Sequence, residues 1–157
     1  MKIKLLVIGK TDDKNLNQLI ENYQKRLQHY INFRLEVIPD LKNSKNLSQL
    51  QQKEKEGELI LSKIQAFDQM ILLDEKGKEF RSIEFANYLQ KKMNSGIKQL
   101  VFVIGGPYGF SEKVYQKAMG KISFSKMTFS HQMIRLFVVE QVYRGFTILR
   151  NEPYHHE

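Results

Sequence analysis

Cysteine is absent from the 157 residues of this protein. Without thiols it can form no disulfide, so it needs no oxidising compartment. The same absence excludes thiolate attack on a pyrimidine ring, iron–sulfur radical chemistry and zinc held by thiolates. Two adjacent histidines, His155 and His156, stand near the end of the sequence, but no further pattern of metal ligands accompanies them. We therefore expect no metal site.

The sequence also lacks a long apolar segment. Its charged first residues lead into only a short apolar run, and no run reaches the length of a membrane span. We expect neither a signal peptide nor a membrane segment, which makes the cytoplasm the simplest compartment. There is no repeat, low-complexity segment or linker. At this length, residues 1–157 are expected to form a single domain with a sizeable core.

Basic residues are in clear excess. The formal net charge is +8 at pH 7, which favours a polyanionic partner such as RNA. A solvated lysine-rich surface without a partner is the alternative, so charge alone does not decide the function.

Short apolar segments alternate with segments of helical periodicity along the sequence. Such alternation predicts an α/β fold with a mainly parallel sheet and helices on both faces. Strands are expected over residues 2–9, 33–39, 69–73, 100–104 and 122–124, and the last helix over residues 130–149. The intervening helices are expected to start near Asp12 and Asp13, Ser48, Ser82 and Ser111.

A glycine-rich turn follows the fourth predicted strand. Gly105 and Gly106 can take positive φ and let a ligand approach the main chain, and Pro107 restricts the residue before it. In an open α/β sheet, ligands bind outside the carboxyl ends of the strands. A tight turn that needs glycine for its own geometry is the alternative. The spacing fits neither a dinucleotide fingerprint nor a P-loop, so conventional phosphate binding is not indicated.

The last third of the sequence has two unusual features. Residues 124–133 alternate small hydroxyl residues with methionine and phenylalanine, which indicates a loop packed against the core or against a flat, partly apolar ligand. The helix predicted over residues 130–149 is apolar around most of its circumference. Such a helix must be buried on nearly all sides, so we expect a homodimer of the isologous two-fold kind through this helix.

Several motifs together resemble a known family, and the resemblance runs from the first strand to the last residues. The residues concerned are Leu72, Leu73, Asp74, Gly77 and Lys78; Ile104 to Gly109; Phe124 to Phe129; His131, Arg135 and Glu140 to Arg144; and Pro153, Tyr154 and His155. With these residues the protein resembles the RlmH family of ribosomal RNA large-subunit methyltransferases, which belongs to the SPOUT superfamily.

The resemblance implies an α/β fold with a C-terminal trefoil knot. Periodicity cannot indicate a knot, because knots are nearly absent from proteins. It further implies a homodimer that transfers a methyl group from S-adenosylmethionine to N3 of a pseudouridine in helix 69 of 23S rRNA, on assembled ribosomes. By motif match, the donor is bound by Leu73, Gly105, Phe124, Ser125, Lys126, Met127, Thr128 and Phe129.

The same resemblance places the chemistry near the C-terminus. Because N3 of a uracil ring carries a proton with an alkaline pKa, catalysis must orient the two reactants and favour the deprotonated base. We expect Arg144 or Arg135 to offset charge on the base oxygens, His155 to accept the proton and Tyr154 to stack on the base. The alternatives are an ion pair of Arg135 with Glu140, a packing role for Tyr154 and a phosphate contact for His155.

Two other classes of function stay open on the sequence. Charge supports a non-catalytic module that binds RNA or the ribosome, and the glycine turn supports an α/β protein that binds a nucleotide or flavin. Binding of S-adenosylmethionine distinguishes the methyltransferase from both.

Overall fold

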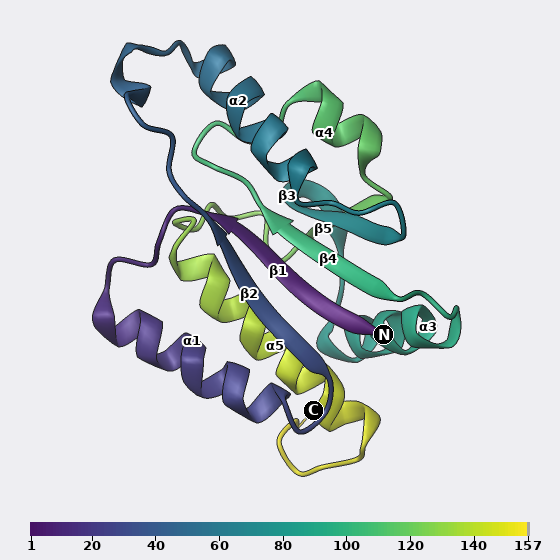
Figure 1. Ribbon diagram of the computed structural model, residues 1–157. Coiled ribbons are helices and arrows are strands. Elements are labelled where there is room, and N and C mark those ends of the chain that lie inside the picture. The colour runs from purple at the N-terminus through teal and green to yellow at the C-terminus, as the bar shows by residue number, and fades with distance from the viewer. Residues whose placement is uncertain (157) are drawn as a thin grey trace.

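The protein forms one five-stranded parallel sheet with helices on both faces (Figure 1). The computed structural model describes residues 1–156. The strand order is β2-β1-β4-β3-β5, and every pair is parallel. The predicted α/β class is confirmed. In sequence order, the elements are β1 (Lys2–Ile8), α1 (Lys14–Leu27), β2 (Asn32–Ile38), a 3-10 turn (Ser44–Asn46), α2 (Gln49–Ser62), β3 (Asp68–Glu79), α3 (Ser82–Asn94), β4 (Gln99–Ile104), α4 (Glu112–Lys117), β5 (Gly120–Ser123) and α5 (Met133–Leu149).

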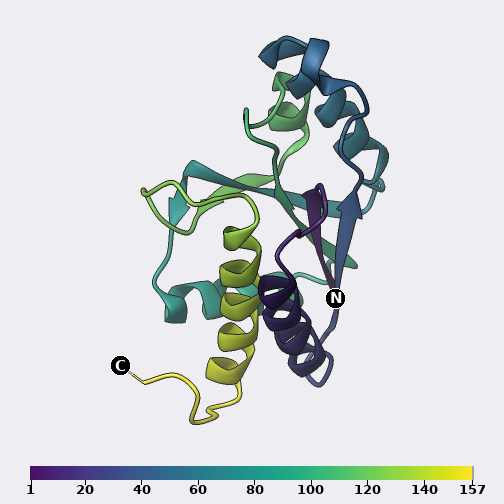
Figure 2. The ribbon, with the colours of Figure 1, turned by 90° about the vertical axis from the view of Figure 1, so that its left-hand side faces the viewer.

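The helices divide into two layers, which Figure 2 shows on opposite sides of the sheet. Helices α1, α3 and α5 cover one face, and their apolar side chains form the larger core with the strands. Helices α2 and α4 cover the other face over a smaller core. Strand β4 lies between β1 and β3, and its residues 100–104 are each 5% exposed or less. A strand buried on both faces explains the unbroken apolar run of residues 100–104.

The helices begin at the capping residues predicted from the sequence, with two exceptions. Asp13 accepts a hydrogen bond from the Leu16 N–H at 2.8 Å and caps α1, and Ser48 forms a capping box with Gln51. Ser82 does not cap α3: the cap is Arg81, whose N–H donates to Glu84. The Ser82 hydroxyl donates instead to Gln141 of α5 at 2.9 Å.

Helix α5 is the second exception, because it begins later than the sequence indicates. The sequence predicts its start at Ser130, but the helix starts at Met133, whose N–H donates to the Ser130 hydroxyl at 3.0 Å. Residues 124–132 therefore belong to the loop between β5 and α5. The threading of this C-terminal segment as a trefoil knot stays a prediction.

Strand β3 contains a bulge that the sequence did not indicate. Leu73 and Lys78 both pair with Ile122 of β5, so the residues between them leave the ladder. The strand then continues to Glu79, whereas the sequence predicts its end at Leu73. The bulge carries the side chains of residues 74–76 to the carboxyl edge of the sheet.

Within residues 1–156, no helix combines the length and the apolar character that crossing a membrane requires.

We predict that Gly77→Ala strongly destabilises the protein. A Cβ at Gly77 would lie 2.5 to 2.8 Å from three backbone atoms of Ile122, its N, its Cα and its carbonyl carbon. These atoms cannot rotate away, so β3 and β5 must separate, at a cost of about 3 kcal/mol in the free energy of unfolding. Urea denaturation followed by circular dichroism measures this loss.

Gly120→Ala is the matched control, because its Cβ would meet only Ile71 Cδ1, at an ordinary 3.6 Å. We expect a change of about 0.5 kcal/mol or less. Equal stability of the two variants would contradict the role assigned to the bulge.

Candidate active site

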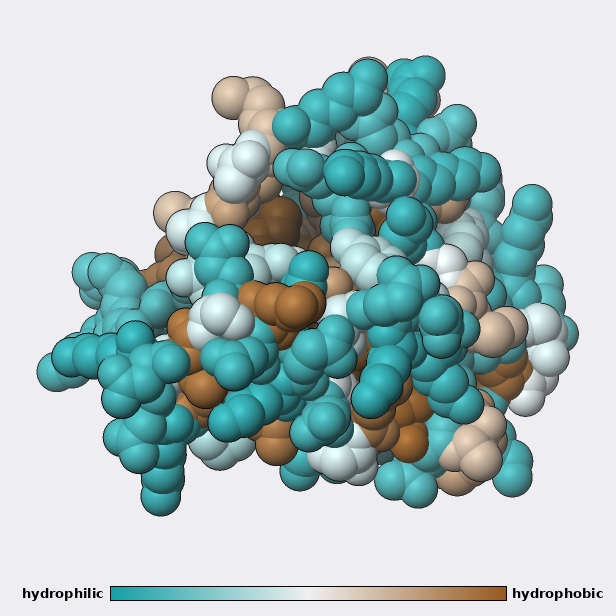
Figure 3. All heavy atoms as spheres, turned by 90° about the horizontal axis from the view of Figure 1, so that it is seen from above, coloured by the Kyte–Doolittle hydropathy of each residue, from teal (hydrophilic) through white to brown (hydrophobic). Residues whose placement is uncertain are grey.

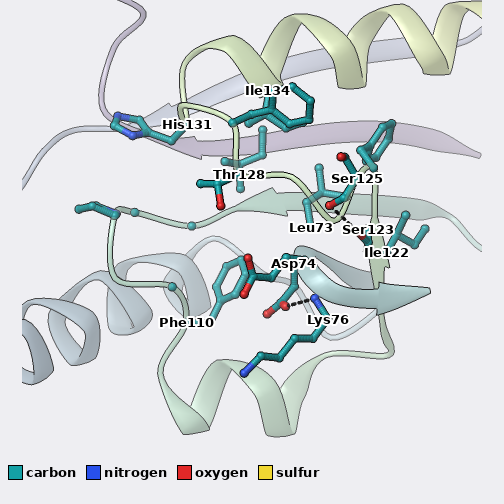
Figure 4. Close-up of a pocket in the computed structure, with 18 of the residues that line it drawn as sticks. Leu73, Asp74, Lys76, Phe110, Ile122, Ser123, Ser125, Thr128, His131 and Ile134 are labelled. Carbon is teal, nitrogen blue, oxygen red and sulfur yellow. Dashed lines mark hydrogen bonds between the residues drawn. The ribbon is translucent and has the colours of Figure 1, made fainter. Parts of the chain in front are cut away.

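Three segments of the protein, together with Tyr115 of α4, enclose a cavity of about 500 Å³ at the carboxyl edge of the sheet (Figure 4). The first is the bulge of β3, residues 73–76. The second is the glycine turn that follows β4, residues 104–110, and the third runs from β5 into α5 and includes residues 122–125 and 127–131. The carboxyl ends of parallel strands are the usual ligand site of an open α/β sheet, and the volume is in the range of small-molecule sites.

The two glycines of the turn are required by the side chains packed against them. A Cβ at Gly105 would lie 3.0 Å from the Phe110 ring, and a Cβ at Gly106 would overlap Glu56 Oε2. The positive φ of this turn is found at Gly109, at 78°, and not at Gly105 or Gly106. The freedom to take positive φ is therefore not used at the first two glycines. Both nevertheless line the cavity, so a ligand there meets main chain without side chains.

The cavity combines apolar walls with a few polar groups. Figure 4 shows Leu73, Ile122 and Ile134 among the lining side chains, with Asp74, Lys76, Thr128 and His131. The polar groups come from the bulge and from the loop before α5. This mixture of apolar surface and few polar groups is typical of a site for a partly aromatic, partly charged small molecule.

A tyrosine from α4 holds the carboxylate of the bulge. The Tyr115 hydroxyl donates to Asp74 Oδ2 at 2.5 Å, and Asp74 Oδ1 accepts from the Lys76 N–H at 2.8 Å. Burial and the neighbouring Asp74 carboxylate raise the pKa of Tyr115, so the phenol keeps its proton. The Asp74 carboxylate is thus fixed in orientation at the cavity wall.

The cavity contains seven of the eight residues that the resemblance assigned to donor binding. Lys126 is the exception: it does not line the cavity, and its 84% exposed side chain lies 3.7 Å from Glu79. The seven are Leu73, Gly105, Phe124, Ser125, Met127, Thr128 and Phe129.

Sequence reasoning missed Asp74, Lys76, Tyr115 and His131 as lining residues. The polar run after the third strand was the available signal for the first two.

A second polar cluster lies toward the carboxyl end of α5. Glu140 Oε1 accepts from Arg144 Nη2 at 2.6 Å, from Arg144 Nε at 3.0 Å and from the Tyr154 hydroxyl at 3.1 Å. The Arg144 guanidinium also lies 4.7 Å from the centre of the Tyr154 ring. Three of the four residues predicted to be catalytic, Arg144, Tyr154 and His155, thus lie together around Glu140. The sequence assigned Glu140 no role except as an alternative ion-pair partner of Arg135.

The hydrogen bonds of this cluster fix the charge of its groups. The hydrogen bond to Glu140 raises the pKa of Arg144, although burial lowers it, so the guanidinium stays charged. Burial, the hydrogen bond with Tyr23 and the charge of Glu140 raise the pKa of Tyr154, which stays a neutral phenol.

His155 has one occupied and one free ring nitrogen. Its Nδ1 lies 3.3 Å from Arg144 Nη1, and its buried Nε2 has no partner within residues 1–156. Because a guanidinium can only donate, Nδ1 is the acceptor in this hydrogen bond, which corresponds to the tautomer with its proton on Nε2. His155 therefore offers an N–H donor rather than a free base at Nε2.

Arg135, the fourth predicted catalytic residue, does not belong to this cluster. Its side chain is fully buried, and its guanidinium donates to the carbonyls of Ile8, Gly9 and His131 and to the Thr11 hydroxyl, at 2.6 to 3.0 Å. It ties α5 to the end of β1 and makes no ion pair with Glu140, because Arg144 takes that carboxylate. A guanidinium enclosed in this way is not available to a substrate base.

The cavity and the second cluster lie at different places along one helix. Ile134 of the cavity and Arg144 of the cluster are ten residues apart on α5, which corresponds to about 15 Å along the helix axis. Figure 2 shows the cavity loop at one end of α5 and the tail after its other end. Fold and cavity together define a parallel α/β protein with a small-molecule site at the carboxyl edge of its sheet.

Comparison with known proteins identifies the family. The family model described as "Predicted SPOUT methyltransferase" matches residues 1–155, and the chain belongs to this family. Proteins called ribosomal RNA large subunit methyltransferase H are similar over the whole length: 71% identical in Flavobacterium johnsoniae, with 100% of both chains covered, and 66% in Christiangramia forsetii, with 99% covered.

A solved structure supports the fold. The protein is similar to a probable methylase family protein from Haemophilus influenzae Rd KW20, with a TM-score of 0.52 and 13% identity, over 95% of this chain and 66% of that chain. Among residues 1–156, no group of three or more histidine, aspartate or glutamate side chains is placed to hold a metal ion.

Proposed function

We propose that the protein transfers a methyl group from S-adenosylmethionine to ribosomal RNA of the large subunit, at N3 of a pseudouridine in helix 69 of 23S rRNA on assembled ribosomes. Family membership and the full-length relatives called ribosomal RNA large subunit methyltransferase H support the reaction class. The net charge of +8 suits an RNA partner. The observation that carries the proposal is the cavity, which is lined by bare main chain and by the loop that the resemblance assigned to the donor.

The residues of the cavity fit S-adenosylmethionine. The main chain at Gly105 and Gly106 offers hydrogen-bonding groups for an adenosine. The side chains of Leu73, Ile122 and Phe124 offer apolar contacts for its base. When bound, S-adenosylmethionine supplies a methyl group that its sulfonium already activates. The Asp74 carboxylate, held by Tyr115, is a negative group at the cavity wall, and it suits the cationic part of the donor.

The second cluster acts on the base. The N3 proton leaves to solvent water before transfer, the deprotonated ring is the nucleophile, and its negative charge spreads to the neighbouring oxygens. Arg144 is oriented by Glu140 and carries a permanent positive charge. This charge stabilises the negative charge on the base oxygens. We assign His155 a donor role through Nε2–H, which is buried in one protomer and must be uncovered when RNA binds, in place of the proton acceptor expected from the sequence. Tyr154, whose ring contacts Arg144 and Tyr143, keeps the stacking role on the base that we expect from the sequence.

A homodimer would bring the cavity and the polar cluster around Glu140 close together. Transfer requires reacting atoms about 3 to 3.5 Å apart, but the cavity and Arg144 of one protomer are separated along α5. One protomer also leaves Met127, Phe129, Met133 and Phe137 between 40% and 75% exposed beside the cavity. We propose that a two-fold dimer buries this apolar face and brings the cluster of one protomer to the cavity of its partner.

We predict that S-adenosylmethionine binds with micromolar affinity in a calorimetric titration and that 23S rRNA in ribosomes then gains N3-methylpseudouridine, detected by mass spectrometry. Thr128 lines the cavity and is exposed to solvent. A tryptophan at this position therefore fills the cavity without disturbing the core, and Thr128→Trp should abolish both signals. No heat with S-adenosylmethionine, but binding of a flavin or nicotinamide nucleotide, would overturn the proposal. RNA binding without the donor would favour a non-catalytic module.

We predict that two inactive variants restore activity when mixed. Thr128→Trp blocks the cavity and Arg144→Ala removes the charge at the base. If each site is built from two protomers, half of the dimers after mixing are mixed, and each has one intact site, so about a quarter of the native rate returns. Sedimentation of each variant checks that it is dimeric. Continued inactivity of a mixed, folded dimer would contradict the shared site.

We predict that His155→Gln retains most of the rate and His155→Ala loses about a hundredfold, because the amide of glutamine still offers an N–H donor. The native rate should rise about tenfold per pH unit below the pKa of the imide. The pH dependence of kcat/KM for all three proteins measures this. If His155 is the base, the glutamine variant will be as slow as the alanine variant.

A further inference from the structure

Helix α2 carries a buried carboxyl group that the proposed methyl transfer does not use. Glu56 is 3% exposed and lies beside the smaller core, although the outer surface of α2 is polar, as Figure 3 shows for this side of the molecule. Oε1 accepts from Gln52 Nε2 at 2.9 Å, while the equally buried Oε2 has no partner within residues 1–156. A buried polar atom without a partner is costly, so its position calls for an explanation.

The free oxygen of Glu56 lies against the glycine turn. A Cβ at Gly106 would overlap Oε2 and would lie 2.8 Å from both Cδ and Oε1, so the carboxyl group fills the space that a side chain would need. Gly106 lines the cavity and Glu56 does not. The carboxyl group therefore contacts the turn without forming part of the cavity surface.

The next residue of α2 contacts the other end of the same turn. A Cβ at Gly57 would overlap the Ser111 hydroxyl oxygen. Ser111 is 1% exposed, does not cap α4 with its side chain and has no hydrogen-bond partner for its hydroxyl within the described residues. Figure 1 places the turn after β4 beside α2. Two consecutive residues of α2 thus support the glycine turn at its start and at its end.

The surroundings of Glu56 also connect it with the cavity. Burial raises the pKa of this carboxyl, and so does the charge of Asp40, whereas His131 at the cavity lowers it.

We propose that Glu56 is a positioning residue for methyl-donor binding. Its carboxyl group holds the main chain at Gly106 in the conformation that receives the donor, and Oε2 is the acceptor for a backbone N–H of the turn in the bound state. Glu56 touches no reacting atom. The inference rests on the proposed donor site, and it assigns to α2 a part in donor affinity rather than in the transfer step.

Kinetic constants of Glu56→Leu and Glu56→Gln test the proposal. Leucine fills similar space but cannot accept a hydrogen bond, so KM and Kd for S-adenosylmethionine should rise about tenfold, while kcat at saturating donor changes by about threefold or less. Glutamine keeps the shape and an acceptor oxygen and should restore donor affinity. Glu58→Leu, on the exposed side of the same helix, is the matched control and should leave both constants unchanged.

Thermal unfolding separates positioning from general stability. Because a buried carboxyl without full pairing opposes folding, the melting temperature of Glu56→Leu should not fall below that of the native protein. A purely structural role predicts the reverse pattern: a lower melting temperature with unchanged KM for the donor.

A double-mutant cycle keeps the proposal testable even if the leucine variant folds poorly. Gly106→Ala should weaken donor binding about tenfold in the native background, because its Cβ meets the Glu56 carboxyl. In the Glu56→Ala background the space is vacant, and adding Gly106→Ala should cost no further affinity. Additive effects would overturn the inference.

The outcome for the native protein distinguishes the two proposals. If the native protein takes up no S-adenosylmethionine in calorimetry, the proposed function fails. If the native protein binds the donor and a folded Glu56→Leu binds it equally well, or if Glu56→Gln is as impaired as Glu56→Leu, only the role of Glu56 is wrong.

Discussion

Close packing behind the glycine turn is the constraint on which the site depends. The Phe110 ring and the Glu56 carboxyl occupy the positions that side chains at Gly105 and Gly106 would take. Because both glycines are needed by the protein itself, the main chain of the turn is left bare toward the cavity. The rigid sheet beneath it, with β4 buried on both faces, fixes where this bare main chain emerges. The bare main chain at the cavity wall thus follows from internal packing.

The bulge of β3 and the late start of α5 complete the cavity in the same way. A regular β3 would have kept Asp74 and Lys76 in the ladder with β5, but the bulge releases them toward the glycine turn. The loop before α5 is long because the helix begins only at Met133. Arg135, buried in the first turn of that helix, ties its start to the end of β1. Each deviation from regular secondary structure therefore adds a wall to the cavity.

Much of the fold and part of the site could be predicted. Apolar runs and capping residues located the strands and most helix starts, since burial and backbone hydrogen bonding are local requirements. The motif match located seven cavity residues. The predictions for Ser82 and Arg135 differ from the structure because contacts with distant residues determine what these side chains do. Ser82 donates to Gln141 instead of capping α3. Arg135 is enclosed by backbone carbonyls and cannot reach a substrate base.

The sequence by itself determined the class of fold, because alternating apolar strands and amphipathic helices can bury their apolar faces only as a layered parallel sheet. It also determined where the glycine turn and the apolar last helix lie. Only the tertiary structure decided that Glu56 stands behind the turn, that Arg144 and not Arg135 pairs with Glu140, and that His155 Nδ1 faces Arg144. These outcomes depend on groups far apart in the sequence, whose contacts no local pattern encodes.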